Sequence, residues 1–132
     1  MKTATLFLSA AALLVIPFFA SAAEPWVAPA SAKNRANAYA NNASAVAAGK
    51  KLFVANCVSC HGPTGKGDGP AAVALNPKPA NFSDSKVSRQ ADGELFWKIS
   101  EGRGAMVPWK GALNETQRWQ LVNYIRSIAP KN

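Results

Sequence analysis

Histidine, cysteine and acidic residues are scarce in this sequence of 132 residues, which has one His, two Cys and seven Asp or Glu. Three Cys and His side chains are too few for a closed zinc site, which needs four ligands. No general acid–base pair or nucleophile constellation is apparent. Methionine is also rare, because Met106 is the only one besides Met1. Apart from one N-terminal segment, no apolar run is long enough to cross a membrane. The length fits a single domain.

The N-terminal segment has the pattern of a secretory signal peptide. Lys2 precedes an almost unbroken apolar run from residue 6 to residue 20, and the small residues Ala20, Ser21 and Ala22 follow. The alternative is an uncleaved membrane anchor, but the run is about 15 residues long and contains Pro17, whereas a span needs ~20. We therefore predict a signal peptide over residues 1–22, cleaved after Ala22 or one residue later, and an exported, periplasmic protein.

The charge balance is basic. The formal net charge is +8, and loss of Lys2 with the signal peptide lowers it to +7. A moderately basic surface suits partners with acidic docking surfaces. The charges are scattered and do not form runs, so we expect no binding to nucleic acid. We also expect a monomer with no stable membrane insertion after signal cleavage.

The rest of the chain predicts an N-terminal arm or linker over residues 23–44, rich in Ala, Asn and Pro, and one domain over residues 45–132. Trp26 is either a residue that pins the arm to the domain or an exposed residue of no special role. Apolar spacing indicates helices over residues 43–56, 92–102 and 115–127, with a short helical turn over 71–75. No strand pattern is convincing. The fold class is therefore all-α, with three to four helices and long loops.

Capping residues support these helix boundaries. Asn42 or Ser44 can cap the first helix, and Asp92 is the predicted N-cap of the second, which Gly102 ends. Asn114, with Gln117 three residues later, has the spacing of a capping box for the last helix. A small domain with such long loops would have too little core by itself. A large apolar cofactor at its centre removes that difficulty.

The segment Cys57-Val58-Ser59-Cys60-His61 contains both cysteines and the only histidine. Paired cysteines in an exported chain usually suggest a disulfide, but two thiols three residues apart followed by His are typical of covalent haem attachment. Each thiol can add to one vinyl group to form a thioether, and His61 can bind the iron as the proximal ligand. The alternative of a redox dithiol would be expected beside a βαβ pattern, which is absent.

Met106 is the candidate for the sixth iron ligand. It lies in a loop rich in Gly and Pro, and a soft thioether favours reduced iron. In isolation, a Met that fills a gap in the core would be the commoner role. If His61 and Met106 fill both axial positions, no open site remains for oxygen or a substrate. The prediction is then an electron carrier and not an enzyme.

At this point the sequence resembles the bacterial monohaem class I c-type cytochromes over about residues 45–129. Five blocks occur in the order typical of that family: Ala48 to Phe53, Cys57 to His61, the glycine-rich segment 62–70, the segment 92–96 that leads to Met106, and 119–126. The resemblance implies a small class I cytochrome c fold around one covalently bound haem c. One departure is Val107, which stands between Met106 and Pro108 where many relatives have Pro directly after Met.

The resemblance also implies roles for single residues. Cys57 and Cys60 would bind the haem covalently, with His61 and Met106 as axial ligands. The Pro70 carbonyl would accept a hydrogen bond from the outer nitrogen of His61. Gly49 and Phe53 would cross the C-terminal helix near Leu121 and Tyr124. The haem pocket would be lined by Pro79, Phe82 and Trp109.

Two functions remain open from the sequence. The first is a periplasmic shuttle that carries single electrons between redox proteins, and the second is a permanently bound haem c subunit of a larger redox enzyme complex. A haem sensor or a peroxidase-like enzyme is a third possibility, which requires an open sixth site. Lysines expected near the haem rim would steer an acidic partner or serve only solubility: Lys50, Lys51, Lys66, Lys78 and Lys110.

Overall fold

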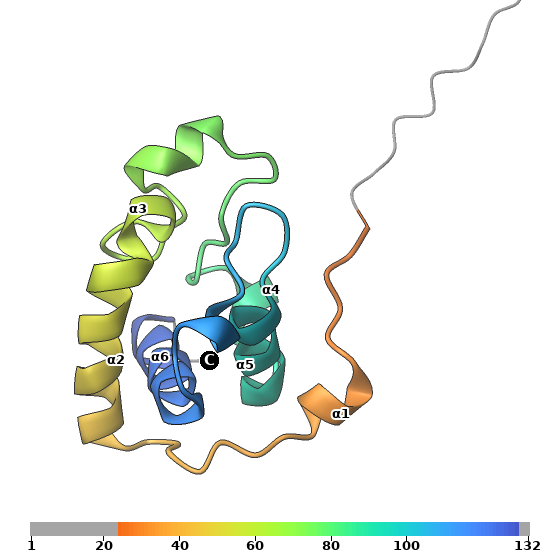
Figure 1. Cartoon of the computed structure of the whole chain (residues 1–132), viewed down its shortest axis with the longest axis vertical. Coiled ribbons are helices and arrows are strands. Elements are labelled where there is room, and N and C mark those ends of the chain that lie inside the picture. Colours follow the sequence, from red (N-terminus) through yellow and green to blue (C-terminus); the bar gives the residue numbers. More distant parts are fainter. Residues whose placement is uncertain (1–23, 130–132) are drawn as a thin grey trace, which may run out of the picture.

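The computed structural model describes residues 24–129, which form helices joined by loops (Figure 1). Within it the only β pairing is an isolated bridge between Arg103 and Met106. The three long helices correspond to those predicted from the sequence, and three single-turn helices and two 3-10 turns accompany them. In chain order the elements are α1 (Ala30–Lys33), α2 (Ala43–Asn56), α3 (Val58–His61), η1 (Pro70–Ala74), α4 (Ser85–Ser88), α5 (Asp92–Glu101), η2 (Trp109–Gly111) and α6 (Glu115–Ile128).

Helix α2 has the predicted boundaries. Asn42 is its N-cap, and the Asn42 side chain accepts a hydrogen bond from the backbone N–H of Ala45 at 2.9 Å. This bond satisfies one of the amide donors that the first turn of a helix leaves free. The buried face of α2 carries Ala45, Gly49 and Phe53, at the four-residue spacing of one helical side.

Helices α2 and α6 pack against each other at Gly49. A Cβ at this position would lie 1.9 Å from the backbone oxygen of Gln120 and 3.0 Å from the Cβ of Tyr124. One turn later, the rings of Phe53 and Tyr124 are 5.1 Å apart. The close approach predicted for Gly49 and Phe53 is confirmed, and it requires glycine because any side chain would collide with the backbone of α6.

Helix α5 begins one position earlier than predicted. Ala91 is the N-cap, and its backbone N–H donates to the carboxylate of Glu94 at 2.7 Å. Asp92 is the first helical residue, so the prediction that it is the N-cap was wrong. The physical reason is that the Asp92 carboxylate is bound by Asn37 and Arg126 instead. Gly102 ends the helix as predicted, with φ of 62°.

The apolar core lies between these three helices, with α6 between α2 and α5 (Figure 1). Helix α6 begins after Asn114, which forms the predicted capping box with Gln117. The rings of Phe96 in α5 and Trp119 in α6 stack at 4.1 Å. Leu95, Phe96 and Ile99 point inward as predicted, and the most deeply buried side chains are Phe53, Leu121 and Val122.

The described part of the N-terminal arm lies on the domain, passing α5 and α6 before it enters α2 (Figure 1). The ring of Trp26 contacts Trp97 of α5, so Trp26 pins the arm. The predicted signal peptide, residues 1–22, lies outside the described residues. Among residues 24–129 no helix is both long and apolar enough to span a membrane.

Candidate haem-binding site

An apolar pocket collects residues from distant parts of the chain. The long helices α2, α5 and α6 supply four apolar side chains, and the segments between them supply the imidazole, the two sulfur groups and two further aromatic rings. The lining residues are Phe53, Cys57, His61, Phe82, Ile99, Met106, Trp109, Leu121 and Ile125.

Cys57 connects α2 to the short helix α3. Its backbone N–H donates to the carbonyl of Phe53 at 2.8 Å, and its own carbonyl accepts from the N–H groups of Cys60 and His61. This helical turn brings the side chains at positions 57, 60 and 61 to one side. Both thiols are free of disulfide. Burial, and then the neighbouring Cys60, raise the pKa of Cys57 to about 12.

The His61 ring is held by two neighbours. It stacks on Phe82, with ring centroids 4.8 Å apart and an interplanar angle of 17°. Its Nδ1 lies 3.2 Å from the carbonyl oxygen of Ala80. Since a carbonyl only accepts hydrogen bonds, Nδ1 must carry the proton, and a neutral ring then has its free lone pair on Nε2. Burial lowers the pKa of His61, against the opposite effect of the Ala80 hydrogen bond.

The partner of His61 differs from the one expected, because Ala80 and not Pro70 provides the carbonyl. The glycine-rich loop explains this position: the N–H of Gly67 donates to the His61 carbonyl at 2.8 Å. A Cβ on Gly67 would lie 2.3 Å from the backbone oxygen of Pro79. This close approach brings the segment of Pro79 and Ala80 beside the histidine. Pro70 instead begins the turn η1.

Met106 is presented by a tight turn that follows α5. Two backbone hydrogen bonds of 3.0 Å join Arg103 and Met106. A Cβ on Gly102 would lie 2.3 Å from the Met106 carbonyl oxygen, so the turn needs glycine there. The Met106 side chain is half-buried and packs against the core at the pocket.

The pocket therefore combines a thiol, an imidazole and a thioether with an apolar lining, and a second thiol lies three residues from the first. This donor set fits a haem attached through Cys57 and Cys60. The family model for cytochrome c matches residues 46–129. The chain belongs to the cytochrome c family.

Similar proteins agree with a class I monohaem cytochrome. The chain is 33% identical to cytochrome c6 of Leptolyngbya boryana over 86 residues, 64% of this chain and 94% of the relative. It is also 33% identical over 84 residues, 62% of this chain, to the cbb3-type cytochrome c oxidase subunit FixP of Bradyrhizobium diazoefficiens, but spans only 27% of that subunit. The solved structure of the KustC0563 c-type cytochrome has a TM-score of 0.54 at 26% identity, covering 62% of this chain and 98% of its own.

The family confirms the expected cofactor, one covalently bound haem c. Of the other predicted pocket residues, Phe82 and Trp109 line the pocket of this cytochrome. Phe82 is fixed by its N–H, which donates to Gly65 at 2.7 Å. Cys60, Pro70 and Pro79 are not among the lining residues.

Some site residues were missed by sequence reasoning. Ile99, Leu121 and Ile125 line the pocket of the cytochrome, yet their helical spacing predicted only that they are buried. The Ala80 carbonyl was missed because a backbone acceptor leaves no mark on the identity of its residue.

Proposed function

We propose that this cytochrome carries single electrons between redox proteins, with His61 and Met106 as axial ligands of a haem held by Cys57 and Cys60. The observation that carries this proposal is that His61, Met106 and Cys57 line one apolar pocket. The bound haem would supply a one-electron iron couple. The two thiols would hold it through thioether bonds, so that neither ligand has to retain it alone.

The protein groups would act by fixing the ligands and excluding water. The Ala80 carbonyl holds the His61 ring with Nε2 free, and Phe82 restricts its rotation. The turn at Met106 presents a soft sulfur, which stabilises reduced iron and raises the potential. Because both ligands would stay in place when the iron changes oxidation state, reorganisation would be small. We therefore propose a carrier and not an enzyme.

The setting proposed for this carrier is the periplasm, after export by the predicted signal peptide, and its expected form is a monomer. The five lysines expected near the haem rim are all exposed. Two of them also have internal partners: Lys78 donates to the carbonyls of Ala72 and Val73, and Lys110 pairs with Glu101 at 2.5 Å. Lys50, Lys51 and Lys66 are therefore the better candidates for steering a partner with an acidic surface.

The test is the optical spectrum of protein matured in a periplasm. Oxidised wild-type protein should show the weak absorption band of an iron–methionine bond near the red edge of the visible. Met106→Ala should lose this band while its haem stays covalently attached. Val107→Ala, which changes the exposed neighbour, is the control and should retain it. A spectrum unchanged by Met106→Ala would refute the ligand assignment. Absence of the iron–methionine band from the wild-type spectrum would favour an open sixth site.

A second candidate function is that of a permanent haem subunit in a larger complex. The observation that favours it is the similarity to FixP, in which the matched segment is only 27% of a cbb3-type oxidase subunit. Size-exclusion chromatography of the protein from its native membrane and periplasmic fractions distinguishes the two functions. A shuttle should elute as a monomer whose partner binding weakens with salt, whereas a subunit should co-purify with its complex.

A further inference from the structure

The N-terminal arm, residues 24–42, precedes the segment that the cytochrome c family model matches, but it is fastened to that segment along most of its length. At its start, the ring of Trp26 lies 6.3 Å from that of Trp97, and the ammonium group of Lys98 lies 5.4 Å from the Trp26 ring. Both partners belong to α5, the helix that leads to the Met106 turn.

The middle of the arm fits a notch on α5 at Gly93. A Cβ on Gly93 would lie 2.0 Å from the Ala32 carbonyl oxygen and 2.8 Å from that of Arg35. The guanidinium of Arg35 lies over the Phe96 ring at 4.5 Å and pairs with Glu115 at 2.5 Å. The backbone of the arm therefore occupies the space that an ordinary side chain of α5 would fill.

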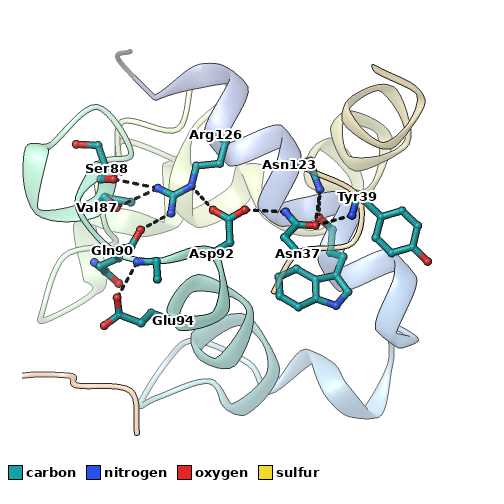
Figure 2. A network of polar contacts seen from close by, with 11 residues as sticks. Asn37, Tyr39, Val87, Ser88, Gln90, Asp92, Glu94, Asn123 and Arg126 are labelled. Atoms are coloured by element: carbon teal, nitrogen blue, oxygen red, sulfur yellow. Dashed lines mark hydrogen bonds and ion pairs between the residues drawn. The ribbon is translucent and has the colours of Figure 1, made fainter. Parts of the chain in front are cut away.

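The end of the arm joins a polar network that includes α6 (Figure 2). Asn37 donates to one oxygen of Asp92 at 2.7 Å, and Arg126 donates to the other at the same distance. Asn37 also accepts from Asn123 at 3.4 Å. Figure 2 shows Asp92 between Asn37 and Arg126, so one carboxylate connects the arm, α5 and α6.

The first described residue of the arm contacts the Met106 turn directly. Arg103 donates through Nη2 to the Glu24 carbonyl oxygen at 2.8 Å. The same Arg103 forms both backbone hydrogen bonds of the bridge to Met106. The arm thus holds α5, which enters the turn, and also the residue that closes the turn.

We propose that residues 24–42 are a positioning strap that keeps Met106 on the iron by restraining α5 and the Arg103–Met106 bridge, although no strap residue lines the pocket. This inference rests on the proposed ligation by Met106. The strap acts only through these backbone elements, so its loss should make Met106 leave the iron more often without changing which residue is the ligand.

The experiment measures how fast imidazole replaces Met106 in oxidised holoprotein, followed by loss of the red-edge band. Gly93→Ala should expel the strap, because the new Cβ would collide with the backbone of the strap. The substitution does not weaken α5 by itself, since Ala is a better helix former than Gly. Replacement should become faster by roughly tenfold or more, which corresponds to a closed state destabilised by ~1.4 kcal/mol relative to the open state. Trp26→Ala removes one fastening without a clash and should accelerate replacement less.

Two control variants separate positioning from general destabilisation. Gly111→Ala adds a methyl group that meets nothing within 4 Å, close to the same loop, and should leave the rate unchanged. Val122→Ala opens a cavity at a fully buried position of α6 that is not among the residues lining the pocket. It should lower the melting temperature but leave the imidazole rate as in the wild type.

Amide hydrogen exchange gives an independent readout of the bridge, because the N–H of Arg103 donates to the Met106 carbonyl and the N–H of Met106 donates to the Arg103 carbonyl. Both should exchange faster in Gly93→Ala than in Val122→Ala. The strap would be refuted, but ligation by Met106 would not, by either of two results. One is a wild-type rate of imidazole replacement in both Gly93→Ala and Trp26→Ala, and the other is an equal acceleration of that replacement in Val122→Ala. A wild-type protein without the red-edge band would instead refute ligation by Met106, and the strap's role with it.

Discussion

The crossing of α2 and α6 leads to a prediction for Gly49→Ala, which should destabilise the protein although alanine is the better helix former. The new Cβ would lie 1.9 Å from the Gln120 carbonyl oxygen, whereas carbon and oxygen atoms in contact are ~3.3 Å apart. The two helices must then separate locally by roughly 1.4 Å, the difference between these distances. Neither partner is the flexible end of a side chain, so the backbone itself must move.

The magnitude follows from two opposing contributions. Overpacking of a well-packed core costs about 1–3 kcal/mol, and a backbone collision belongs at the upper end. Replacing Gly by Ala inside a helix returns about 1 kcal/mol. The net loss in the free energy of unfolding should be about 2 kcal/mol. For a domain of this size, this lowers the melting temperature by roughly 10 °C.

The assay is thermal unfolding of oxidised holoprotein, followed by far-ultraviolet circular dichroism. Gly111→Ala is the matched control, since its Cβ meets nothing within 4 Å, and it should differ from the wild type by less than ~0.5 kcal/mol. A melting temperature of Gly49→Ala equal to or above that of the wild type would show that the helices do not approach as closely as described.

Three further changes test the polar contacts. Arg126→Leu leaves the Asp92 carboxylate, whose side chain is 28% exposed, without its ion pair, and should cost about 2 kcal/mol in urea unfolding, between the values for exposed and buried pairs. Asn114→Ala removes the N-cap of α6 and should cost about 1 kcal/mol in the same assay. The hydrogen bond from Arg35 is the main cause that lowers the pKa of Glu115 below 4.5. Its stabilising effect, relative to Glu115→Gln, should be present above pH 4.5 and disappear as the pH falls through the lowered pKa.

Each of these predictions has its own control. Arg89→Leu removes an exposed arginine that takes part in none of the ion pairs found in residues 24–129, and an equal loss there would argue against a specific role of Arg126. Asn114→Asp keeps a capping oxygen and should retain most of the stability. In an Arg35→Gln background, the pH-dependent difference in stability between the protein with Glu115 and the Glu115→Gln variant should largely vanish. If it persists unchanged, another group causes the effect.

The sequence predicted those elements whose causes are local. The boundaries of α2 follow from the spacing of Gly49 and Phe53 and from the cap at Asn42, all within a few residues. The capping box of α6 follows in the same way from Asn114 and Gln117. The sulfur and imidazole groups were found because these residue types are rare in the chain.

The features that were not predicted depend on distant contacts. Asp92 has the right identity for an N-cap, but Arg126, which lies 34 positions later, takes its carboxylate. The Ala80 carbonyl replaces that of Pro70 because Gly67 admits the backbone of Pro79. The course of the arm depends on Gly93, whose missing side chain leaves room for residues about 60 positions earlier.

The contact between Gly49 and Gln120 also has a consequence for chain topology. It closes a loop of about 70 residues that contains every group proposed to bind the haem, and the entropy of closing such a loop grows only with the logarithm of its length. Doubling the loop would cost only about 0.6 kcal/mol. Insertions in the connections around the haem are therefore inexpensive as long as the two helices still meet at this glycine. The fold can gain new surface for partner recognition next to its redox centre without rebuilding its core.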